Sequence, residues 1–461
     1  MPTAGRGDLG ARARLHRVRP IPRIAMRRVN AGMKRTSVRA DAPPRRARGP
    51  YCVCGNGPVR SGGGQTVVKI LHLHSTFVAP WGGAEAYLFS LAAAQRARGH
   101  DVEIVAAVAD GDSIARAAGA GVRVTVRPTW RPYAPDRRGS SPIARALFHG
   151  LDLLHAVIRP RAYRRAPDDS DLLHVHRFQG VGASMLRARR APVVHTAHDF
   201  CLVDTTSTTL RDGVLPTRLG PAQRLRARIV ALSARRATVI VFPSQRTRLR
   251  HEELGLGTGH ALVRVVPHGW PAPPLPTAEI GPPPRPRFVF LGRLNESKGV
   301  DLLLRAWEHM RLDADLVIAG DGPERAAVEA AVSDRLQYVG WVDADAKGAL
   351  IRSATALVFP SLWPETFGLV IAESLLLGRP VVATPAAAGE LIIDGQNGVV
   401  SSGVTPAALA EALRRIATDS ALRETVTCGA ALSAADLDFD HHVDRIEAIY
   451  REAQDAFRSQ H

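Results

Sequence analysis

The sequence has few cysteines and no long apolar runs. Only four cysteines occur in 461 residues, and they are too scattered for a disulfide scaffold or a structural zinc site. No apolar run approaches the ~20 residues of a membrane-spanning helix. No hydrophobic core follows the basic residues at the start of the sequence, so we expect no export signal. These absences predict a cytoplasmic protein. A chain of 461 residues is long enough for two globular domains.

The net charge of +18 comes mostly from one segment. Residues 1–66 hold fifteen Lys or Arg and two Asp, and thus carry +13 of that total. The segment is rich in Gly, Pro and Arg and shows no apolar periodicity, which predicts a disordered basic extension. Binding of nucleic acid through this extension is one hypothesis. We expect instead an inert tail, or a start codon assigned too early, and no nucleic-acid partner.

From residue 67 onward, short apolar runs alternate with helical patterns. The run Val67–His74 is typical of a buried parallel strand, and a helical pattern follows over Ala84–Arg98. The same alternation predicts strands near 102–107, 122–127, 171–176, 192–196, 238–242 and 262–266. It is interrupted by a proline-rich stretch, 276–287, that predicts a semi-rigid linker. It then resumes with strands near 287–291, 314–318, 336–339, 355–359 and 380–383.

This alternation predicts an α/β fold of two Rossmann-like, doubly wound parallel-sheet domains that face a deep cleft. The first domain would span 67–275 and the second 288–438. Residues 439–461 have helical periodicity and would pack back on the first domain. Ligands of such sheets bind at the carboxyl ends of the strands, so the cleft is the expected site.

Two carboxylates follow the strand that ends at Phe359. A turn carries Glu365, and a helix is predicted from about Thr366. Glu373 lies eight residues after Glu365, a little over two helical turns, so both carboxylates can lie near one edge of the cleft. The start of the helix offers free N–H groups to an anion. A helix with two solvated glutamates is the alternative interpretation.

A second stretch, Gly292–Gly299, supplies two cations. Arg293 and Lys298 lie on a loop between a predicted strand and a predicted helix. An arginine fork and a lysine point charge at this place suit a diphosphate. Ser297 stands where a P-loop needs glycine before its lysine, so we do not expect an NTPase. A solvated loop is the alternative.

Together these stretches resemble the retaining GT-B glycosyltransferases with a paired-glutamate (E-x7-E) signature, which are glycosyltransferase family 4-like (group 1). The spacing from Glu365 to Glu373 is similar to that signature, and Gly292–Gly299 is similar to the family's diphosphate loop. Other matching segments follow in the expected order: Gly82–Glu85, His174–His176, Thr196–Asp199, Pro243–Ser244, Gly320–Glu324, Val339–Trp341, Glu390 and Asp394–Gly398. The resemblance covers about residues 67–435.

The resemblance implies a role for each matching residue. Glu373 would hold the ribose of the donor nucleotide, while Glu365 and His198 would face the transferred sugar. Arg293 and Lys298 would clamp the diphosphate. Backbone groups would complete the donor site at Phe367, Gly368 and Leu369, at Gly82 and Gly83, and near Gly322 and Gly340. The segment before Glu390 departs from the pattern, because it carries alanines where many relatives have Gly-Gly.

The resemblance also implies the reaction. A sugar would move from a UDP- or GDP-sugar to a glycan or lipid-linked acceptor, with retention, in the biosynthesis of cell-surface polysaccharide or glycolipid. No metal and no cofactor is implied, because Arg293 and Lys298 would stabilise the charge on the leaving diphosphate. The alternatives are a non-catalytic nucleotide-sugar-binding protein, and an epimerase or phosphorylase of the same fold.

Several other patterns allow a metal or a membrane. The pairs 313/315 and 343/345 are spaced like the metal-binding aspartates of another glycosyltransferase fold, and histidine pairs end predicted strands at 72/74, 174/176 and 195/198. Alternate strand residues share a face, so zinc is conceivable at the first two histidine pairs, although cleft-lining histidines explain them equally well. Residues 127–165 combine nine arginines with an apolar stripe. They would either contact the anionic cytoplasmic face of the inner membrane peripherally, or pack as an ordinary surface helix.

Overall fold

The computed structural model describes residues 67–132, 141–164, 170–187, 189–205, 208–210, 215–273 and 283–460. The predicted basic extension, 1–66, lies outside the described residues, as does most of the predicted linker. Arg287, the last residue of that linker, already belongs to a strand. Within the described ranges, no helix is long and apolar enough to span a bilayer.

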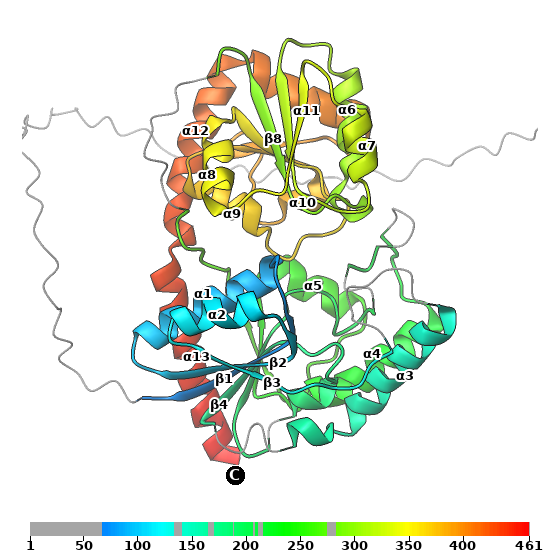
Figure 1. Ribbon diagram of the computed structural model, residues 1–461, viewed down its shortest axis with the longest axis vertical. Coiled ribbons are helices and arrows are strands. Elements are labelled where there is room, and N and C mark those ends of the chain that lie inside the picture. Colours follow the sequence, from blue (N-terminus) through cyan, green and yellow to red (C-terminus); the bar gives the residue numbers. More distant parts are fainter. Residues whose placement is uncertain are drawn as a thin grey trace, which may run out of the picture. The chain divides into compact units, whose positions relative to one another are not determined.

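Seven parallel strands form the first sheet, in the order β3-β2-β1-β4-β5-β6-β7 (Figure 1). The strands are β1 (Lys69–Phe77), β2 (Asp101–Ala109), β3 (Arg123–Val126), β4 (Leu172–Arg177), β5 (Val193–Thr196), β6 (Val239–Phe242) and β7 (Leu262–Val265). The helices of this domain are α1 (Gly83–Ala97), α2 (Gly111–Gly119), α3 (Pro142–Val157), α4 (Pro221–Ala234) and α5 (Gln245–Glu253). The chain reverses direction across the sheet between β1 and β4, where doubly wound sheets bind ligands.

Six parallel strands form the second sheet, in the order β10-β9-β8-β11-β12-β13. The strands are β8 (Arg287–Leu291), β9 (Asp315–Ala319), β10 (Leu336–Gly340), β11 (Ala356–Phe359), β12 (Val381–Ala383) and β13 (Gly398–Val400). The helices are α6 (Val300–His309), α7 (Arg325–Ala330), α8 (Ala344–Ser353), α9 (Leu369–Leu376), α10 (Pro385–Ala388), α11 (Pro406–Thr418) and α12 (Ser420–Ser433). The switch point of this sheet lies between β8 and β11.

The two-sheet architecture confirms the predicted α/β fold class. Central strands are buried along their whole length, as in β5, β6 and β11, because helices cover both faces of each sheet. Two details of the prediction were wrong. The helix expected from about Thr366 begins at Leu369, since Gly368 takes a left-handed conformation (φ 88°) and caps it. The sixth strand of the second sheet, β13, has only three residues and had no recognisable apolar run.

Helix α13 (Phe439–Gln460) lies along the first sheet, and is drawn in red in Figure 1. Its buried residues recur at helical spacing, and they join the core that contains Ile70 of β1 and Tyr87 of α1: Val443, Ile446, Tyr450 and Ala453. Tyr87 of α1 donates a hydrogen bond to His442 Nε2 at 2.8 Å. The end of the described chain is therefore part of the first domain's core.

Candidate active site

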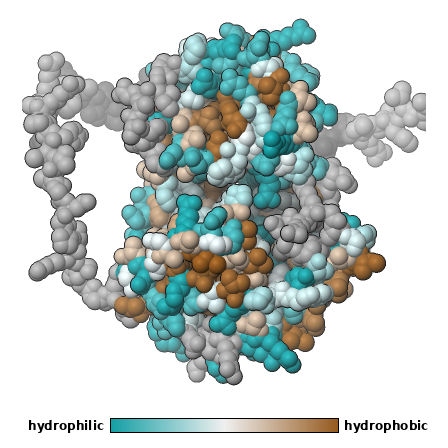
Figure 2. Space-filling model, in the orientation of Figure 1, coloured by the Kyte–Doolittle hydropathy of each residue, from teal (hydrophilic) through white to brown (hydrophobic). Residues whose placement is uncertain are grey.

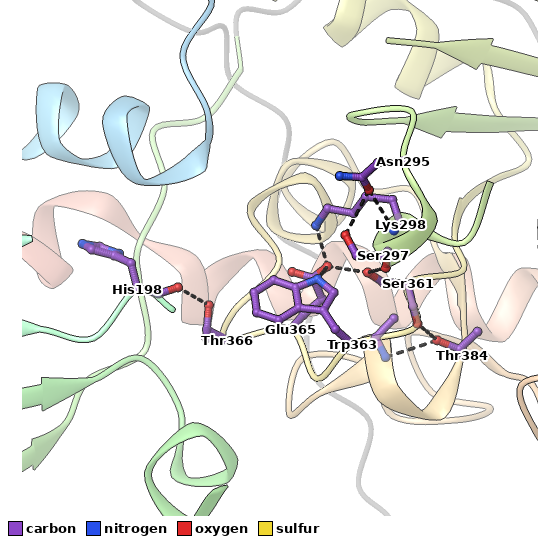
Figure 3. Close-up of polar contacts among 10 residues, drawn as sticks. His198, Asn295, Ser297, Lys298, Ser361, Trp363, Glu365, Thr366 and Thr384 are labelled. Atoms are coloured by element: carbon purple, nitrogen blue, oxygen red, sulfur yellow. Dashed lines mark hydrogen bonds and ion pairs between the residues drawn. The ribbon is translucent and has the colours of Figure 1, made fainter. Parts of the chain in front are cut away.

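Glu365 is the most heavily bonded carboxylate at the carboxyl edge of the second sheet (Figure 3). Its Oε1 accepts from Lys298 Nζ at 2.5 Å, from Ser361 Oγ at 2.6 Å and from Trp363 Nε1 at 2.6 Å. The side chain is 6% exposed. Because all three donors converge on one oxygen, Oε2 is left without a hydrogen-bond partner among the described residues and is available to a ligand hydroxyl.

Lys298 reaches Glu365 from the loop that follows β8. Asn295 accepts from the Lys298 backbone N–H at 3.2 Å and so caps a single 3-10 turn, Glu296–Lys298. The ammonium group also lies 5.5 Å from the centre of the Trp363 ring. Ion pairing and the cation–π contact together hold the lysine beside the carboxylate.

Glu373, in α9, has a similar arrangement. Its Oε1 accepts from Lys347 Nζ at 2.5 Å and from Trp270 Nε1 at 3.1 Å. Its Oε2 is buried and has no partner within the described part of the chain. A buried carboxylate oxygen normally accepts a hydrogen bond, so a ligand hydroxyl would complete this site.

Lys347 and Trp270 were not predicted from the sequence. A usable signal was the scarcity of lysine: the chain has only four, Lys34, Lys69, Lys298 and Lys347, beside many arginines. Two of these four pair with the two glutamates. An arginine tends to bind both oxygens of a carboxylate, whereas a lysine ammonium group can bind only one of them. A lysine therefore suits a buried carboxylate whose other oxygen must stay free.

The remaining predicted residues of the second domain lie on neighbouring loops. Arg293 is exposed and has no ion-pair partner among the residues described. Gly322 has φ 157°, and a Cβ added there would lie 2.3 Å from the Leu294 carbonyl oxygen. The Gly340 carbonyl accepts from Gly320 N–H at 2.7 Å. The loops after β8, β9 and β10 are thus packed backbone to backbone beside Arg293.

The starts of two helices meet across the domains. Gly82 caps α1 of the first domain, and a Cβ added to Gly83 would lie 3.0 Å from Leu369 Cδ1, the first residue of α9. Phe367 is buried and Gly368 caps α9. Each helix start carries a partial positive charge, so the two together favour an anion between the domains.

His198 meets the second domain through its backbone. Its carbonyl oxygen accepts from Thr366 Oγ1 at 2.8 Å. Figure 3 shows its ring directed away from Glu365. The imidazole Nε2 lies 3.0 Å from His176 Nδ1, and burial holds the pKa of His198 well below its usual range. The structure therefore places the His198 backbone beside the Glu365 turn and leaves the ring on the first domain.

Three of the four aspartates in the two pairs have structural contacts. Asp313 and Asp315 each pair with Arg285, at 2.9 and 2.7 Å. Asp343 caps α8 by accepting from Ala346 N–H at 2.9 Å. The histidines are not grouped as the pairs in the sequence suggested. His72 of β1 lies beside His174 and His176 of β4, and one nitrogen of each ring lies within 4.8 Å of the others.

Glu390 joins the two domains, a contact that the sequence did not predict. Its carboxylate accepts from the backbone N–H groups of Gln245, at 3.2 Å, and Arg246, at 2.5 Å, which are the first residues of α5. A cavity of about 430 Å³ lies beside this contact and is also lined by Pro364, next to Glu365. This cavity therefore lies beside the Glu390 contact and against the residue that precedes Glu365.

Comparisons with known proteins identify the family. The model described as "Glycosyltransferase Family 4" matches residues 81–272, and the model described as "Glycosyl transferases group 1" matches residues 285–419. D-inositol 3-phosphate glycosyltransferase 1 of Catenulispora acidiphila is 30% identical over 318 residues, 63% of this chain and 74% of that protein. The chain belongs to the family 4, group 1 glycosyltransferases.

Other relatives agree with this assignment. The phosphatidyl-myo-inositol mannosyltransferase of Mycobacterium leprae is 27% identical to this chain. The matched region covers 80% of this chain and 92% of the mannosyltransferase. Anabaena HepE in complex with UDP-glucose has a TM-score of 0.61 at 20% identity, covering 84% of this chain and all of HepE. WaaG, a glycosyltransferase involved in lipopolysaccharide biosynthesis, has a TM-score of 0.58 at 18% identity, covering 83% and 99%. The predicted GT-B fold is confirmed.

Proposed function

We propose that this glycosyltransferase uses a nucleotide-sugar donor, without a metal ion, and transfers the sugar with retention of anomeric configuration. The observation that carries the proposal is the pair of buried glutamates, Glu365 and Glu373, each held by a lysine and each with one oxygen left free. The complex of HepE with UDP-glucose supports a UDP-sugar, and a GDP-sugar is the other candidate.

In this proposal each group acts on a different part of the donor. Glu373 Oε2 accepts from a ribose hydroxyl, and Glu365 Oε2 accepts from a hydroxyl of the sugar. Arg293, Lys298 and the N–H groups at the start of α9 face the diphosphate. Negative charge develops there as the glycosyl–phosphate bond breaks, so these groups stabilise the transition state more than the ground state. They supply the positive charge that a divalent cation would otherwise provide.

The acceptor that we propose is a hydroxyl of a glycan or a lipid-linked acceptor, in cell-surface polysaccharide or glycolipid biosynthesis. Two relatives, the D-inositol 3-phosphate glycosyltransferase and the phosphatidyl-myo-inositol mannosyltransferase, support an inositol-phosphate or phosphatidylinositol acceptor. The cavity beside Glu390 and Pro364 supports entry of the acceptor next to Glu365. A cytoplasmic protein that contacts the membrane peripherally would reach both classes of acceptor.

The exposed surface of α3 and α4 supports this membrane contact. Phe148 of the predicted stripe packs inward, whereas four other apolar residues of α3 face outward: Ile143 is 80% exposed, and Leu147, Leu154 and Val157 are about half exposed. The adjacent helix α4 exposes two leucines and two arginines and has no acidic residue: Leu225, Leu232, Arg224 and Arg228. Figure 2 shows apolar side chains along this edge, at the lower right. An apolar and cationic surface of this kind fits an anionic bilayer.

A vesicle experiment tests the membrane contact. We expect the full chain to co-sediment with vesicles containing phosphatidylglycerol and not with phosphatidylcholine vesicles. Replacing Ile143 and Leu154 with serine removes apolar area and is expected to reduce binding at least fivefold. The matched control is Leu432→Ser, which removes a 77% exposed leucine from α12. Equal binding of the double variant and the wild type would contradict the proposal.

A transfer assay tests the reaction. UDP- and GDP-sugars are supplied with an inositol-phosphate or glycan acceptor, in the presence of EDTA. Proton NMR then compares the anomeric configuration of donor and product. We expect retention, no loss of rate with EDTA, and loss of transfer in Glu365→Gln. An inverted product or strict dependence on a metal would overturn this proposal, and nucleotide-sugar binding without turnover would favour the non-catalytic alternative.

A further inference from the structure

A chain of hydrogen bonds runs through the core of the first domain and ends at His198. Three members are buried side chains of β1, β4 and α1, and the fourth, His198, is half-buried in the loop after β5. His198 Nε2 lies 3.0 Å from His176 Nδ1, and His176 Nε2 lies 2.9 Å from His72 Nδ1. His72 Nε2 lies 2.8 Å from Gln95 Oε1, which ends this branch. The core of the first domain thus holds a continuous polar path of four side chains.

The acceptor at the end of the path sets the direction of every bond. Gln95 Oε1 can only accept, so His72 Nε2 carries the proton and donates. A neutral imidazole has a single N–H, and therefore His72 Nδ1 accepts from His176 Nε2–H. By the same rule His176 Nδ1 accepts from His198 Nε2–H. Burial lowers the pKa of His72 to about 4 and that of His176 well below its usual range, which keeps these rings neutral.

A second branch is consistent with the orientation of the Gln95 amide. Gln95 Nε2 donates to Tyr450 OH at 3.2 Å, and this hydroxyl lies 2.7 Å from His174 Nδ1. His174 Nε2 in turn lies 2.8 Å from Thr196 Oγ1. Tyr450 therefore accepts from Gln95 and donates to His174. With its NH2 group engaged by the α13 tyrosine, the amide presents its oxygen to His72.

We propose that Gln95, His72 and His176 are positioning residues for the transfer reaction. The chain holds His198 as the Nε2–H tautomer and thereby presents Nδ1 as a hydrogen-bond acceptor to a hydroxyl group of the bound substrate. Within the described structure, His198 Nδ1 has no protein partner and is not among the buried, unpaired atoms, so it is the open end of the chain. The inference rests on the proposed function and adds to it that the His198 ring, which is directed away from Glu365, meets the substrate from the first domain.

Three of these histidines, His72, His174 and His176, are grouped closely enough to be considered as a metal site. Their geometry favours hydrogen bonds over metal coordination. Zinc ligands at about 2.0 Å in a tetrahedral arrangement lie roughly 3.3 Å apart. His72 Nδ1 and His176 Nε2 are 2.9 Å apart, a hydrogen-bond distance. Both nitrogens of His174 are also engaged, by Tyr450 and Thr196.

The first test reads the tautomers directly and needs no substrate. The full chain is labelled with 15N at histidine, and single His→Gln variants assign the signals. The 15N chemical shifts distinguish protonated from unprotonated ring nitrogens, and we expect His72, His176 and His198 each to carry the proton on Nε2. In Gln95→Met the terminal acceptor is lost, so we expect the His198 proton to move to Nδ1. The control His195→Gln removes another buried histidine, bonded only to the Val175 carbonyl, and should leave the tautomer unchanged.

Kinetics with the sugar nucleotide that supports transfer provide the second readout. We expect Gln95→Met to lower kcat at least tenfold with little change in KM for the donor, and His195→Gln to leave kcat within twofold. An Nδ1–H tautomer of His198 in the wild type, or an unchanged tautomer in Gln95→Met, would overturn the proposal whether or not transfer is observed. Stoichiometric binding of Co²⁺ with a ligand-field absorption spectrum, lost in His72→Gln, would replace it with a metal site.

Discussion

Lys298 illustrates how a single side chain serves both the fold and the proposed chemistry. It pairs with a carboxylate that is 6% exposed, while its own side chain remains 24% exposed. The lysine can therefore neutralise Glu365 and still face a bound diphosphate. The Lys347–Glu373 pair has the same form, with 29% and 4% exposure. In both pairs the cation is the more accessible partner, as a site for an anionic ligand requires.

Replacing Lys298 with methionine keeps the length of the side chain and removes its charge. We expect kcat for transfer to fall about 100- to 1,000-fold, because a preplaced donor to developing charge is lost. The same assay on Arg305→Met is the control, since Arg305 forms an exposed pair with Asp301 on α6. Near-normal transfer by Lys298→Met would show that this lysine does not act on the leaving group.

Glycines at the carboxyl edge of the second sheet allow loops to pack backbone to backbone. Gly322 and Gly340 both have positive φ, of 157° and 70°, but only Gly322 is crowded. A Cβ at Gly322 would lie 2.3 Å from the Leu294 carbonyl oxygen, whereas a Cβ at Gly340 would meet nothing within 4 Å. The two positions therefore separate steric overlap from backbone strain.

Alanine at each glycine tests that difference. Gly340→Ala carries only the strain of the left-handed conformation, so we expect it to lower the free energy of unfolding by about 1–2 kcal/mol. Gly322→Ala must also displace a loop, and we expect a loss of more than about 3 kcal/mol. Urea unfolding of both variants measures this. Equal losses would show that the loop after β9 moves freely.

The sequence predicted elements better than it predicted contacts between them. Continuous apolar runs located the longer strands, because burial on both faces leaves no other pattern. β13 was missed because a strand of three residues is too short to show an apolar pattern. The start of α9 was misplaced because the sequence does not reveal that Gly368 takes a left-handed conformation. Trp270 and Lys347 reach Glu373 across 103 and 26 residues of chain, and no local pattern records such a meeting.

Contacts between the domains are both apolar and polar: Leu369 lies against Gly83, and the Phe367 ring lies 5.1 Å from that of His268. Ser244 Oγ donates to the Thr366 carbonyl at 3.1 Å, Thr366 Oγ1 donates to the His198 carbonyl, and the Glu390 carboxylate caps α5. The polar contacts can exchange with water, so we expect them to break and re-form if the domains open for the substrate and close over it.

Buried histidines link the stability of the whole molecule to pH. Burial lowers the pKa of His72, His195, His251 and His442 to about 4, from 6.5 in the unfolded chain. As pH falls below 6.5 the unfolded chain binds protons that the folded chain does not, so the free energy of unfolding decreases. We expect little change above about pH 7.5 and, below pH 6, a slope approaching about 1.4 kcal/mol per pH unit for each such histidine.

Urea unfolding at pH 7.5, 6.5 and 5.5 measures this dependence. His251 lies in α5, away from the chain of hydrogen bonds that ends at His198, and donates to the Thr247 carbonyl. His251→Gln should therefore show a shallower decline than the wild type over this range. A free energy of unfolding that rises on acidification, or that is the same at all three pH values, would contradict burial of these histidines in the neutral form.

The central claim is that Glu373 holds the ribose of a nucleotide donor. Calorimetric titration of UDP, GDP and ADP into the full chain tests it most directly, beside Glu373→Gln and the exposed control Glu329→Gln, whose partner is Arg325. We expect one nucleoside diphosphate to bind, Glu373→Gln to weaken it about 10- to 100-fold through loss of a charge-assisted hydrogen bond, and the control to bind normally. Binding of none of the three at millimolar concentration, or equal binding by Glu373→Gln and the wild type, would contradict the account.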